Sequence, residues 1–172
     1  IEKLLSINDV KNIILEKVAF QNMKDFDFVI KLFDEKKIKS FINFPRRVYK
    51  SYQNLKKKIA CEKQIHISHI GKDLDLASNS LHLLDLLLYL TNTKKIIVEA
   101  VFLKNKIYKS PRKGFIELKG TLKFSTNRGD TLHLFDCGSG SRESYGGIKI
   151  ENKNFSYSVY EKYQKIIEVD YF

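Results

Sequence analysis

The sequence predicts an α/β fold in which a short parallel-sheet unit precedes an α+β domain with a large, mostly antiparallel open sheet. Three observations support this. A strand, a helix and a strand follow one another in the first 44 residues, an order typical of parallel sheets. Apolar residues then recur at helical spacing up to about residue 90, and their period changes to two after residue 95. We therefore expect one unit at 1–44 and a second at 45–172.

The first unit is predicted from two short apolar runs on either side of an amphipathic segment. Residues 11–15 (KNIIL) form a buried strand that ends at the charged pair Glu16 and Lys17. Residues 25–37 carry apolar side chains at helical spacing, and 39–43 form the second strand. A parallel sheet of two strands is not a stable domain. We therefore expect more strands, either from residues before Ile1 or from an N-terminal partner chain.

The second unit begins with two predicted helices around a strand. Pro45 suits a helix start, and Val48, Tyr52, Leu55 and Ile59 follow at intervals of three and four. Residues 64–70 alternate between apolar and polar side chains, which is typical of a strand, and 79–90 form a strongly apolar helix. Later segments with a period of two predict the strands of the open sheet: 95–103, 115–124, 131–135, 147–151, 156–160 and 165–171.

Turn signals separate these later strands, at 110–111, 127–130 and 138–147. The third contains Gly138, Ser139 and Gly140, which follow a strand. No helix pattern opens after them, so they are not the glycine-rich turn that binds a dinucleotide.

The net charge of +11 is only weak evidence for a negatively charged binding partner. Lys far outnumbers Arg, and Ile, Asn and Phe are also abundant, so the charge reflects composition. Nucleic acid is therefore the least favoured partner, with net charge its only support. Cys61 and Cys137 stand in no metal-binding spacing, and we expect no metal. Without a signal peptide or an apolar run that spans a bilayer, we expect no membrane contact and a cytoplasmic location.

Three segments, in order, resemble the glucose–fructose oxidoreductase / inositol dehydrogenase (Gfo/Idh/MocA) family. Residues 15–18 (LEKV) resemble the Glu-Lys-Pro motif at a strand end. Residues 43–47 (NFPRR) with the helix after them resemble the start of the family's C-terminal domain. Residues 65–90 resemble its helix with a His-x-x-Asp motif and a closing Tyr-Leu.

The resemblance implies a Rossmann-type domain remnant at 1–44 and the family's substrate and oligomerisation domain at 45–172. It implies reversible hydride transfer between NAD or NADP and a sugar or polyol hydroxyl. Glu16 and Lys17 would lie at the cofactor, with Lys17 also beside the substrate. His82 would be the acid/base, with Asp85 one helical turn on. Arg46, Arg47 and Asn79 would contact the substrate.

The residue chemistry agrees with these roles. Oxidation of an alcohol needs a proton acceptor, and histidine suits that near neutral pH. A nearby Lys17 would stabilise developing alkoxide charge. His82 and Asp85 share a helix face, so the carboxylate can orient the imidazole. Other interpretations stay open: a core histidine at position 82, a salt link from Asp85 to a Lys or Arg, and an interdomain salt bridge from Arg46 and Arg47.

Three departures from the family pattern bear on activity. Val18 replaces the proline, Ser78 replaces an aspartate four residues before His82, and no Gly-x-Gly-x-x-Gly turn exists in the sequence. Without that turn the sequence offers no obvious binding site for the pyrophosphate of NAD(P). We therefore expect a truncated or split NAD(P)-dependent oxidoreductase of a sugar, nucleotide-sugar or polyol, inactive as this chain alone. The alternative is a non-enzymatic binding module. Both allow a homodimer through residues 95–171.

Overall fold

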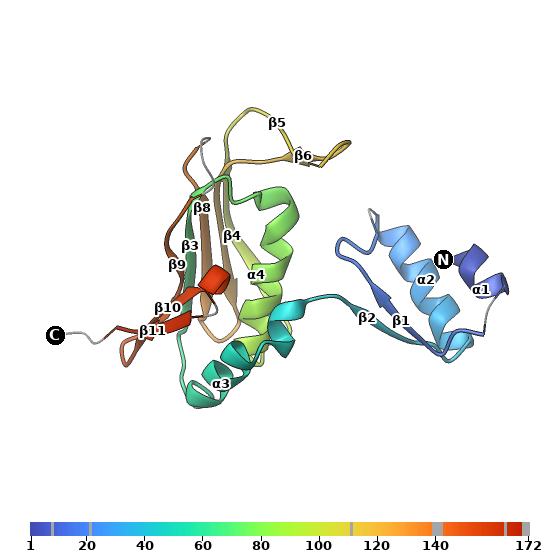
Figure 1. Cartoon of the computed structure of the whole chain (residues 1–172), viewed down its shortest axis with the longest axis horizontal. Coiled ribbons are helices and arrows are strands. Elements are labelled where there is room, and N and C mark those ends of the chain that lie inside the picture. The colour runs from blue at the N-terminus through green and yellow to red at the C-terminus, as the bar shows by residue number, and fades with distance from the viewer. Residues whose placement is uncertain (8, 21, 111, 139–142, 164, 170–172) are drawn as a thin grey trace. The chain divides into compact units, whose positions relative to one another are not determined.

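The computed structural model consists of two compact units, Ile1–Pro45 and Arg46–Phe172 (Figure 1). It describes residues 1–172 except 8, 21, 111, 139–142, 164 and 170–172. Each unit has its own hydrophobic cluster of buried residues, and each is described separately below.

The first unit contains two helices and a two-stranded parallel sheet. Its elements are α1 (Glu2–Ile7), β1 (Asn12–Leu15), α2 (Met23–Glu35) and β2 (Lys39–Ile42). The register runs from Asn12 opposite Lys39 to Leu15 opposite Ile42, which confirms the strand, helix and parallel strand read from the sequence. Helix α2 begins where the Asn22 side chain accepts a hydrogen bond from the Asp25 N–H, as is usual at a helix N-cap. Helix α1 was not predicted.

Leu5, Val29, Phe33 and Ile38 form the core of this first unit. Val29 and Phe33 are four residues apart on α2, so one helix face is buried. Ile14 of β1 lies opposite Phe41 of β2, and these two side chains are 72% and 61% exposed. In parallel sheets both faces are normally covered. One face of this pair therefore remains bare within the unit.

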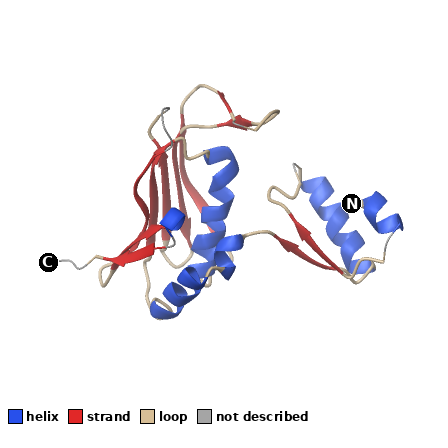
Figure 2. Ribbon diagram, viewed as in Figure 1, coloured by secondary structure: helices blue, strands red, loops and turns tan. Residues whose placement is uncertain are grey.

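The second unit contains helices packed on a seven-stranded sheet (Figure 2). Its helical elements are the 3-10 turn η1 (Pro45–Val48, with its first residue in the first unit), α3 (Lys50–Lys58), α4 (Leu76–Thr91) and the 3-10 turn η2 (Glu161–Tyr163). Its strands are β3 (His66–Lys72), β4 (Ile96–Leu103), β5 (Tyr108–Lys109), β6 (Ile116–Glu117), β7 (Gly120–Thr126), β8 (Thr131–Asp136), β9 (Glu143–Glu151), β10 (Ser156–Tyr160) and β11 (Lys165–Glu168).

The strand order in the large sheet is β11-β10-β9-β3-β8-β7-β4. Only β3 and β8 pair in parallel, and the other neighbours are antiparallel. The mostly antiparallel sheet predicted from the sequence is therefore confirmed. Strands β5 and β6 form a separate small hairpin.

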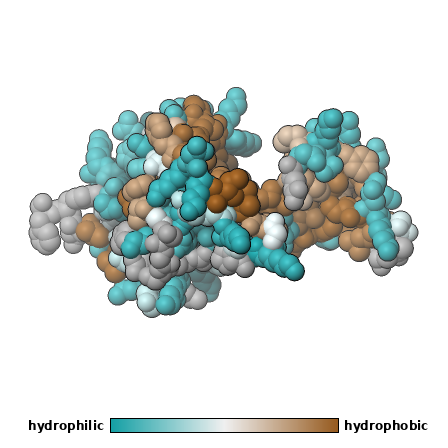
Figure 3. Space-filling view, turned by 90° about the horizontal axis from the view of Figure 1, so that it is seen from above, coloured by the Kyte–Doolittle hydropathy of each residue, from teal (hydrophilic) through white to brown (hydrophobic). Residues whose placement is uncertain are grey.

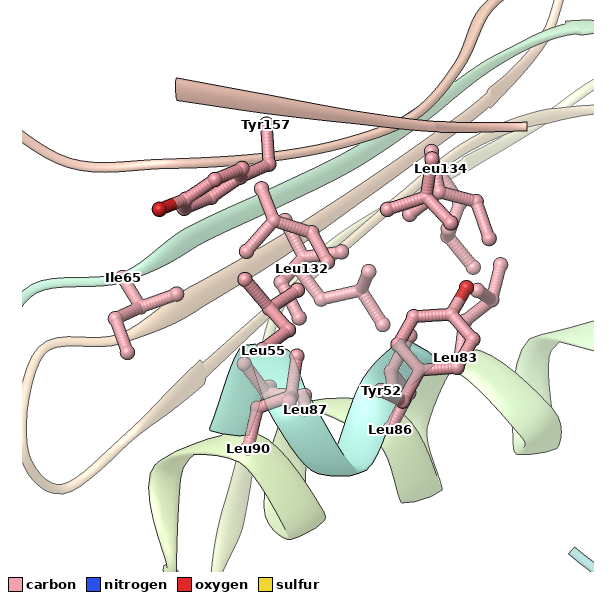
Figure 4. Packing of buried hydrophobic residues seen from close by; sticks show 14 of the residues in the cluster. Tyr52, Leu55, Ile65, Leu83, Leu86, Leu87, Leu90, Leu132, Leu134 and Tyr157 are labelled. Atoms are coloured by element: carbon pink, nitrogen blue, oxygen red, sulfur yellow. The ribbon is translucent and has the colours of Figure 1, made fainter. Parts of the chain in front are cut away.

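Helices α3 and α4 cover one face of this sheet and bury the main core (Figures 1 and 4). Leu83, Leu86, Leu87 and Leu90 of α4 recur every three or four residues and point at the sheet. They meet strand residues that alternate along the chain, such as Leu132 and Leu134, together with Tyr52 and Leu55 of α3. Among the described residues of this second unit, no helix covers the opposite face, which we call the open face.

Several predicted boundaries differ from the structure. The single strand expected at 115–124 is divided into β6 and β7, because Glu117 and Lys119 are buried in polar contacts and Gly120 has φ +131°. Helix α4 begins three residues earlier than expected, since the Ser78 and Asn79 N–H groups both bond to the Asp75 carbonyl. The turn expected at 138–147 is shorter because β9 begins at Glu143, and residues 139–142 lie outside the described residues.

Both units expose apolar side chains among polar ones, seen as brown surface between teal residues in Figure 3. The most exposed in the second unit include Val98 and Phe102 of the edge strand β4. Within the described residues, no helix is long and apolar enough to cross a membrane.

Candidate functional site

The second unit brings most of the predicted site residues to helix α4 and to the segment before α3. The start of α4 is held by its own polar groups. Asn79 donates a side-chain hydrogen bond to the Leu74 carbonyl at 3.0 Å. Asp73 and Asp75, just before the helix, both have positive φ. Asn79, predicted to contact substrate, is thus also a support for the turn that positions α4.

Arg47 and Asp85 form a bidentate ion pair. Arg47 Nε and Nη2 donate to the two carboxylate oxygens of Asp85 over 2.7–3.0 Å. The Asp85 side chain is 8% exposed and that of Arg47 is 47% exposed. Hydrogen bonding to Asp85 raises the pKa of Arg47, with burial acting against it. Of the interpretations left open by the sequence, the structure thus shows the salt link for Asp85.

Tyr89, one helical turn after Asp85, lies beside two cations. The Arg47 guanidinium carbon is 5.6 Å and the Lys56 Nζ 4.0 Å from the centre of the Tyr89 ring. Burial and the charge of Arg47 lower the pKa of Lys56. The end of η1, α3 and α4 are therefore joined by charge and aromatic contacts on the same side of the helix as Asp85.

His82 is partly buried in the middle of α4, and its Nδ1 atom is shielded from solvent. It lies three residues before Asp85 and four after Ser78, so the three share one side of the helix. Both carboxylate oxygens of Asp85 accept hydrogen bonds from Arg47, so the guanidinium holds the Asp85 carboxylate in place. The predicted acid/base role of His82 stays a prediction.

Arg46 occupies a second bidentate pair. Its Nε and Nη2 donate to the two Glu161 oxygens at 2.6 and 2.7 Å, and the Tyr52 hydroxyl donates to the same carboxylate at 2.8 Å. Burial is the largest single influence and opposes the charge of both partners, but the hydrogen bonds and charge attraction around them together outweigh it, so the pKa of Arg46 is raised and that of Glu161 is lowered. Burial, followed by the charge of Glu161, raises the pKa of Tyr52.

The partners of Arg46 and Arg47 both lie in the second unit. The interpretation of Arg46 and Arg47 as an interdomain salt bridge is therefore wrong for these ion pairs, because each arginine is paired with a carboxylate of its own unit. A cavity of about 500 Å³ opens beside the Arg46 pair. Its lining comes from the N-cap and start of α3, from β10 and from η2: Tyr49, Lys50, Ser51, Tyr52, Val159 and Glu161.

A third polar cluster at the start of α4 was not foreseen. Lys119, whose side chain is 5% exposed, forms an ion pair with Asp73 and donates to the Gly138 carbonyl at 2.5 Å. Glu117 is also buried, and its Oε2 accepts from the Ala77 N–H at 3.0 Å. Alternation in the sequence places Glu117 and Lys119 on one side of a strand, but it cannot reveal partners some 40 residues away.

The first unit holds the other predicted residues, Glu16 and Lys17. Both follow the carboxyl end of β1, and Glu16 Oε1 accepts from the Asn43 Nδ2, just after β2, at 2.8 Å. Lys17 is partly buried, and the Lys17–Val18 peptide bond is cis. The carboxyl ends of parallel strands are where open α/β sheets bind ligands.

Among the described residues, no group of three or more His, Cys, Asp or Glu side chains is arranged to hold a metal ion. The described first unit also offers no glycine-rich turn at a helix N-terminus, because α2 begins at Asn22-Met23. Within the described residues, the first unit therefore lacks the glycine-rich turn at a helix N-terminus that typically binds a pyrophosphate, and the cofactor-binding role of Glu16 and Lys17 stays a prediction.

No family model matches the sequence, and no curated protein is found to be similar to it. Solved structures do match. The dehydrogenase MviM from Clostridium difficile superposes with a TM-score of 0.56 at 16% identity, over 91% of this chain and 49% of its own. UDP-N-acetylglucosamine 3-dehydrogenase GnnA from Acidithiobacillus ferrooxidans gives 0.58 at 16%, over 91% and 55%.

The WlbA dehydrogenase from Bordetella pertussis, solved with NADH and UDP-GlcNAcA, gives a TM-score of 0.58 at 17% identity over 86% of this chain and 52% of its own. The chain thus spans about half the length of these similar proteins. At such low identity the likeness concerns the fold. The fold of this chain is that of the C-terminal part of Gfo/Idh/MocA-type dehydrogenases, as the three motifs in its sequence predicted.

Proposed function

We propose that this chain is the substrate-side part of an NAD(P)-dependent oxidoreductase that acts on a sugar, a nucleotide sugar or a polyol. The observation that carries the proposal is the position of the motif residues within a dehydrogenase fold. Lys17 follows the carboxyl end of a parallel strand, and His82 lies on the central helix of the open-sheet unit. Among similar structures, GnnA is named for a UDP-sugar, and WlbA was solved with one.

The proposed chemistry of the chain's own residues is proton transfer and charge stabilisation. His82 accepts the proton of the substrate hydroxyl while the carbinol carbon is oxidised to a carbonyl. Lys17, in the first unit, is proposed to supply a positive charge of the kind that stabilises a developing alkoxide. Bound NAD or NADP supplies the hydride acceptor. Arg47 holds Asp85 and thereby keeps the side of α4 that carries His82 in one arrangement.

The nucleotide site is incomplete in this proposal. Because no glycine-rich turn is present, we propose that the pyrophosphate is bound by polypeptide outside this sequence, either upstream of Ile1 or on an N-terminal partner chain. The bare pair Ile14 and Phe41 on the parallel sheet supports this, since a further layer would bury them. We also propose that the chain self-associates through the sheet at 95–171.

The alternative is a non-enzymatic binding or oligomerisation module with the same fold. Ser78 favours it, because a hydroxyl in place of a carboxylate four residues before His82 weakens an acid/base site. A nucleic-acid-binding role is the weakest alternative and rests only on the net charge of +11.

Histidine NMR distinguishes the two main proposals without requiring catalysis. The chain has four histidines, so His82→Gln identifies the resonance of position 82 by its loss. Titration with sugars, polyols and UDP-sugars should shift the His82 ring signals and leave those of His66 and His133 unchanged. If every ligand left His82 unmoved while the protein stayed folded, the substrate-side proposal would fail and the module would be favoured.

A further inference from the structure

The hairpin of β5 and β6 combines exposed cations with exposed apolar side chains. Among the described residues, β5 pairs with β6 and with no other strand, and the hairpin projects beyond the end of the large sheet (Figure 1). We call residues 104–110 and 112–117 the basic hairpin. Between Glu99 and Glu117 the sequence has no acidic residue. Five cations lie in that stretch, all of them exposed: Lys104, Lys106, Lys109, Arg112 and Lys113.

The basic hairpin has an inner and an outer face. Tyr108 lies opposite Glu117 in the register, and Lys109 lies opposite Ile116. The first pair faces the second unit, because Glu117 is 4% exposed and Tyr108 is partly buried. The second pair faces away, since Lys109 is exposed and Ile116 is 55% exposed. Ile107 is 65% exposed and shares the outer face with Lys109 by alternation. The outer face thus mixes cationic and apolar side chains.

Hydrogen bonds hold both ends of the basic hairpin in place. At its base, Glu117 Oε2 accepts from the Ala77 N–H at the start of α4, at 3.0 Å. At its tip, the Ser110 N–H donates to the Phe115 carbonyl at 3.2 Å, while the Phe115 side chain stays 59% exposed. The outer face and tip are therefore ordered before any partner binds, which lowers the entropy lost on binding.

We infer that the basic hairpin docks the protein on the surface of an anionic lipid bilayer. Lysine and arginine side chains next to such a surface are attracted to the lipid phosphates. Apolar side chains interspersed with them enter the boundary between headgroups and acyl chains, and here these are Ile107, Phe115 and Ile116. This inference goes beyond the proposed oxidoreductase activity and does not depend on it.

The apolar side chains favour a bilayer over nucleic acid as the partner. Nucleic acid would engage the cations, but Ile107 and Ile116 have no aromatic ring on which a base could stack. A bilayer interface accepts both kinds of side chain at once. The sequence-based expectation of no membrane contact rested on the absence of a signal peptide and of a spanning run. Docking at the surface requires neither.

Co-sedimentation of the full chain with vesicles tests the electrostatic part. At about 0.05 M salt the chain should bind phosphatidylcholine vesicles that contain about 30% phosphatidylglycerol, and binding should fade as salt approaches about 0.5 M. Pure phosphatidylcholine vesicles should bind it far more weakly. Lys109→Gln/Lys113→Gln should weaken binding about 25-fold, since each cation contributes about fivefold. The control Lys57→Gln/Lys63→Gln removes the same charge from exposed positions outside the basic hairpin and should have little effect.

Tryptophan fluorescence tests the apolar part. The natural chain has no tryptophan, so Ile107→Trp places a single reporter on the outer face. Its emission should shift to the blue with anionic vesicles, because the indole ring leaves water, and should not shift with inorganic phosphate. Met23→Trp is the matched control, since Met23 is 69% exposed and lies in the first unit. Its emission should not shift.

Several results would overturn the inference, provided that circular dichroism shows each variant to be folded. These are no binding to anionic vesicles at low salt, equal binding to neutral vesicles, equal losses in the two double variants, and vesicle binding without a blue shift in Ile107→Trp. Tighter binding to single-stranded DNA than to vesicles, lost in Lys109→Gln/Lys113→Gln, would also overturn it by assigning the basic hairpin to nucleic acid. None of these results bears on the oxidoreductase proposal, which the His82 titration tests independently.

Discussion

At the residue scale, bidentate ion pairs to Asp85 and Glu161 hold the second unit together around α4 and α3. The family resemblance supplied Arg46, Arg47 and Asp85 as candidates, and the cost of an unpaired buried carboxylate left a salt link open for Asp85. It could not assign partners, since Glu161 is 115 residues from Arg46 and Asp85 is 38 residues from Arg47. Such pairings depend on tertiary structure, which local spacing does not encode.

Removing one member of the Arg47–Asp85 pair should destabilise the protein by about 2–3 kcal/mol. Arg47→Met leaves a buried carboxylate unpaired, and the half-exposed guanidinium keeps the cost below that of a fully buried pair. Urea unfolding followed by circular dichroism measures it. Arg47→Met/Asp85→Leu should recover part of the loss. Equal stability of Arg47→Met and the natural chain would show that the pair contributes nothing.

His69 should make stability depend on pH. Burial is the main cause that lowers its pKa to about 4, while the unfolded value is 6.5. Between these values the unfolded chain binds the proton and the folded chain does not, so stability is complete above pH 6.5 and is lost as pH falls toward 4. The loss should reach about 2 kcal/mol between pH 6.5 and 5.

The measurement is urea unfolding at a series of pH values. Glu161, whose pKa is lowered, contributes its own loss only below pH 4.5, so the window above pH 5 is free of it. His69→Gln should flatten the curve there. His133→Gln serves as the matched control. Burial and the charge of Lys123 also lower the pKa of His133, but its side chain is less buried than that of His69. An unchanged slope in His69→Gln would contradict the assignment.

At the element scale, the period of the apolar residues predicted most strands and helices of both units, but not α1 or β5. The segment at 115–124 was predicted as one strand, since its alternation continues through two strands that belong to different sheets. The break lies at Gly120, where φ is +131° and a Cβ would stand 2.2 Å from the Phe102 carbonyl oxygen. Sequence alternation does not report such a close backbone approach, so the division could not be foreseen.

Gly120→Ala should therefore be severely destabilising, by about 3 kcal/mol, because β4 and β7 would have to separate around the new methyl group. Thermal unfolding measures the loss. Gly114→Ala is the matched control: its φ is +84° but no atom lies within 4 Å of the added Cβ, so only about 1 kcal/mol is expected. Similar costs for both variants would refute the close approach.

At the scale of the whole molecule, the sequence indicated two units because a parallel-sheet pattern gives way to antiparallel alternation. Each unit has a separate core: Val29 and Phe33 contribute to the first, and Leu86 and Leu132 to the second. The small first core and its bare sheet face agree with a unit completed by other polypeptide. No pattern in the sequence could identify such a polypeptide, because the proposal places it outside these 172 residues.

The second unit should fold alone. Residues 46–172 contain the seven-stranded sheet, both covering helices and both arginine pairs. A fragment of these residues should give a cooperative thermal transition and dispersed amide NMR signals. A fragment of 1–45 should not, because a two-stranded sheet is insufficient by itself. An unfolded 46–172 fragment would mean that the first unit is required for the second core.

The most direct test of the central claim is a titration of the purified chain with NADH and NADPH, followed by nicotinamide fluorescence. The account predicts no binding up to millimolar concentrations, because the chain has no glycine-rich turn to bind the pyrophosphate. Addition of the polypeptide that carries such a turn should then create a site that Lys17→Met weakens. Micromolar binding by the chain alone would contradict the account, since a complete nucleotide site would then exist within these 172 residues.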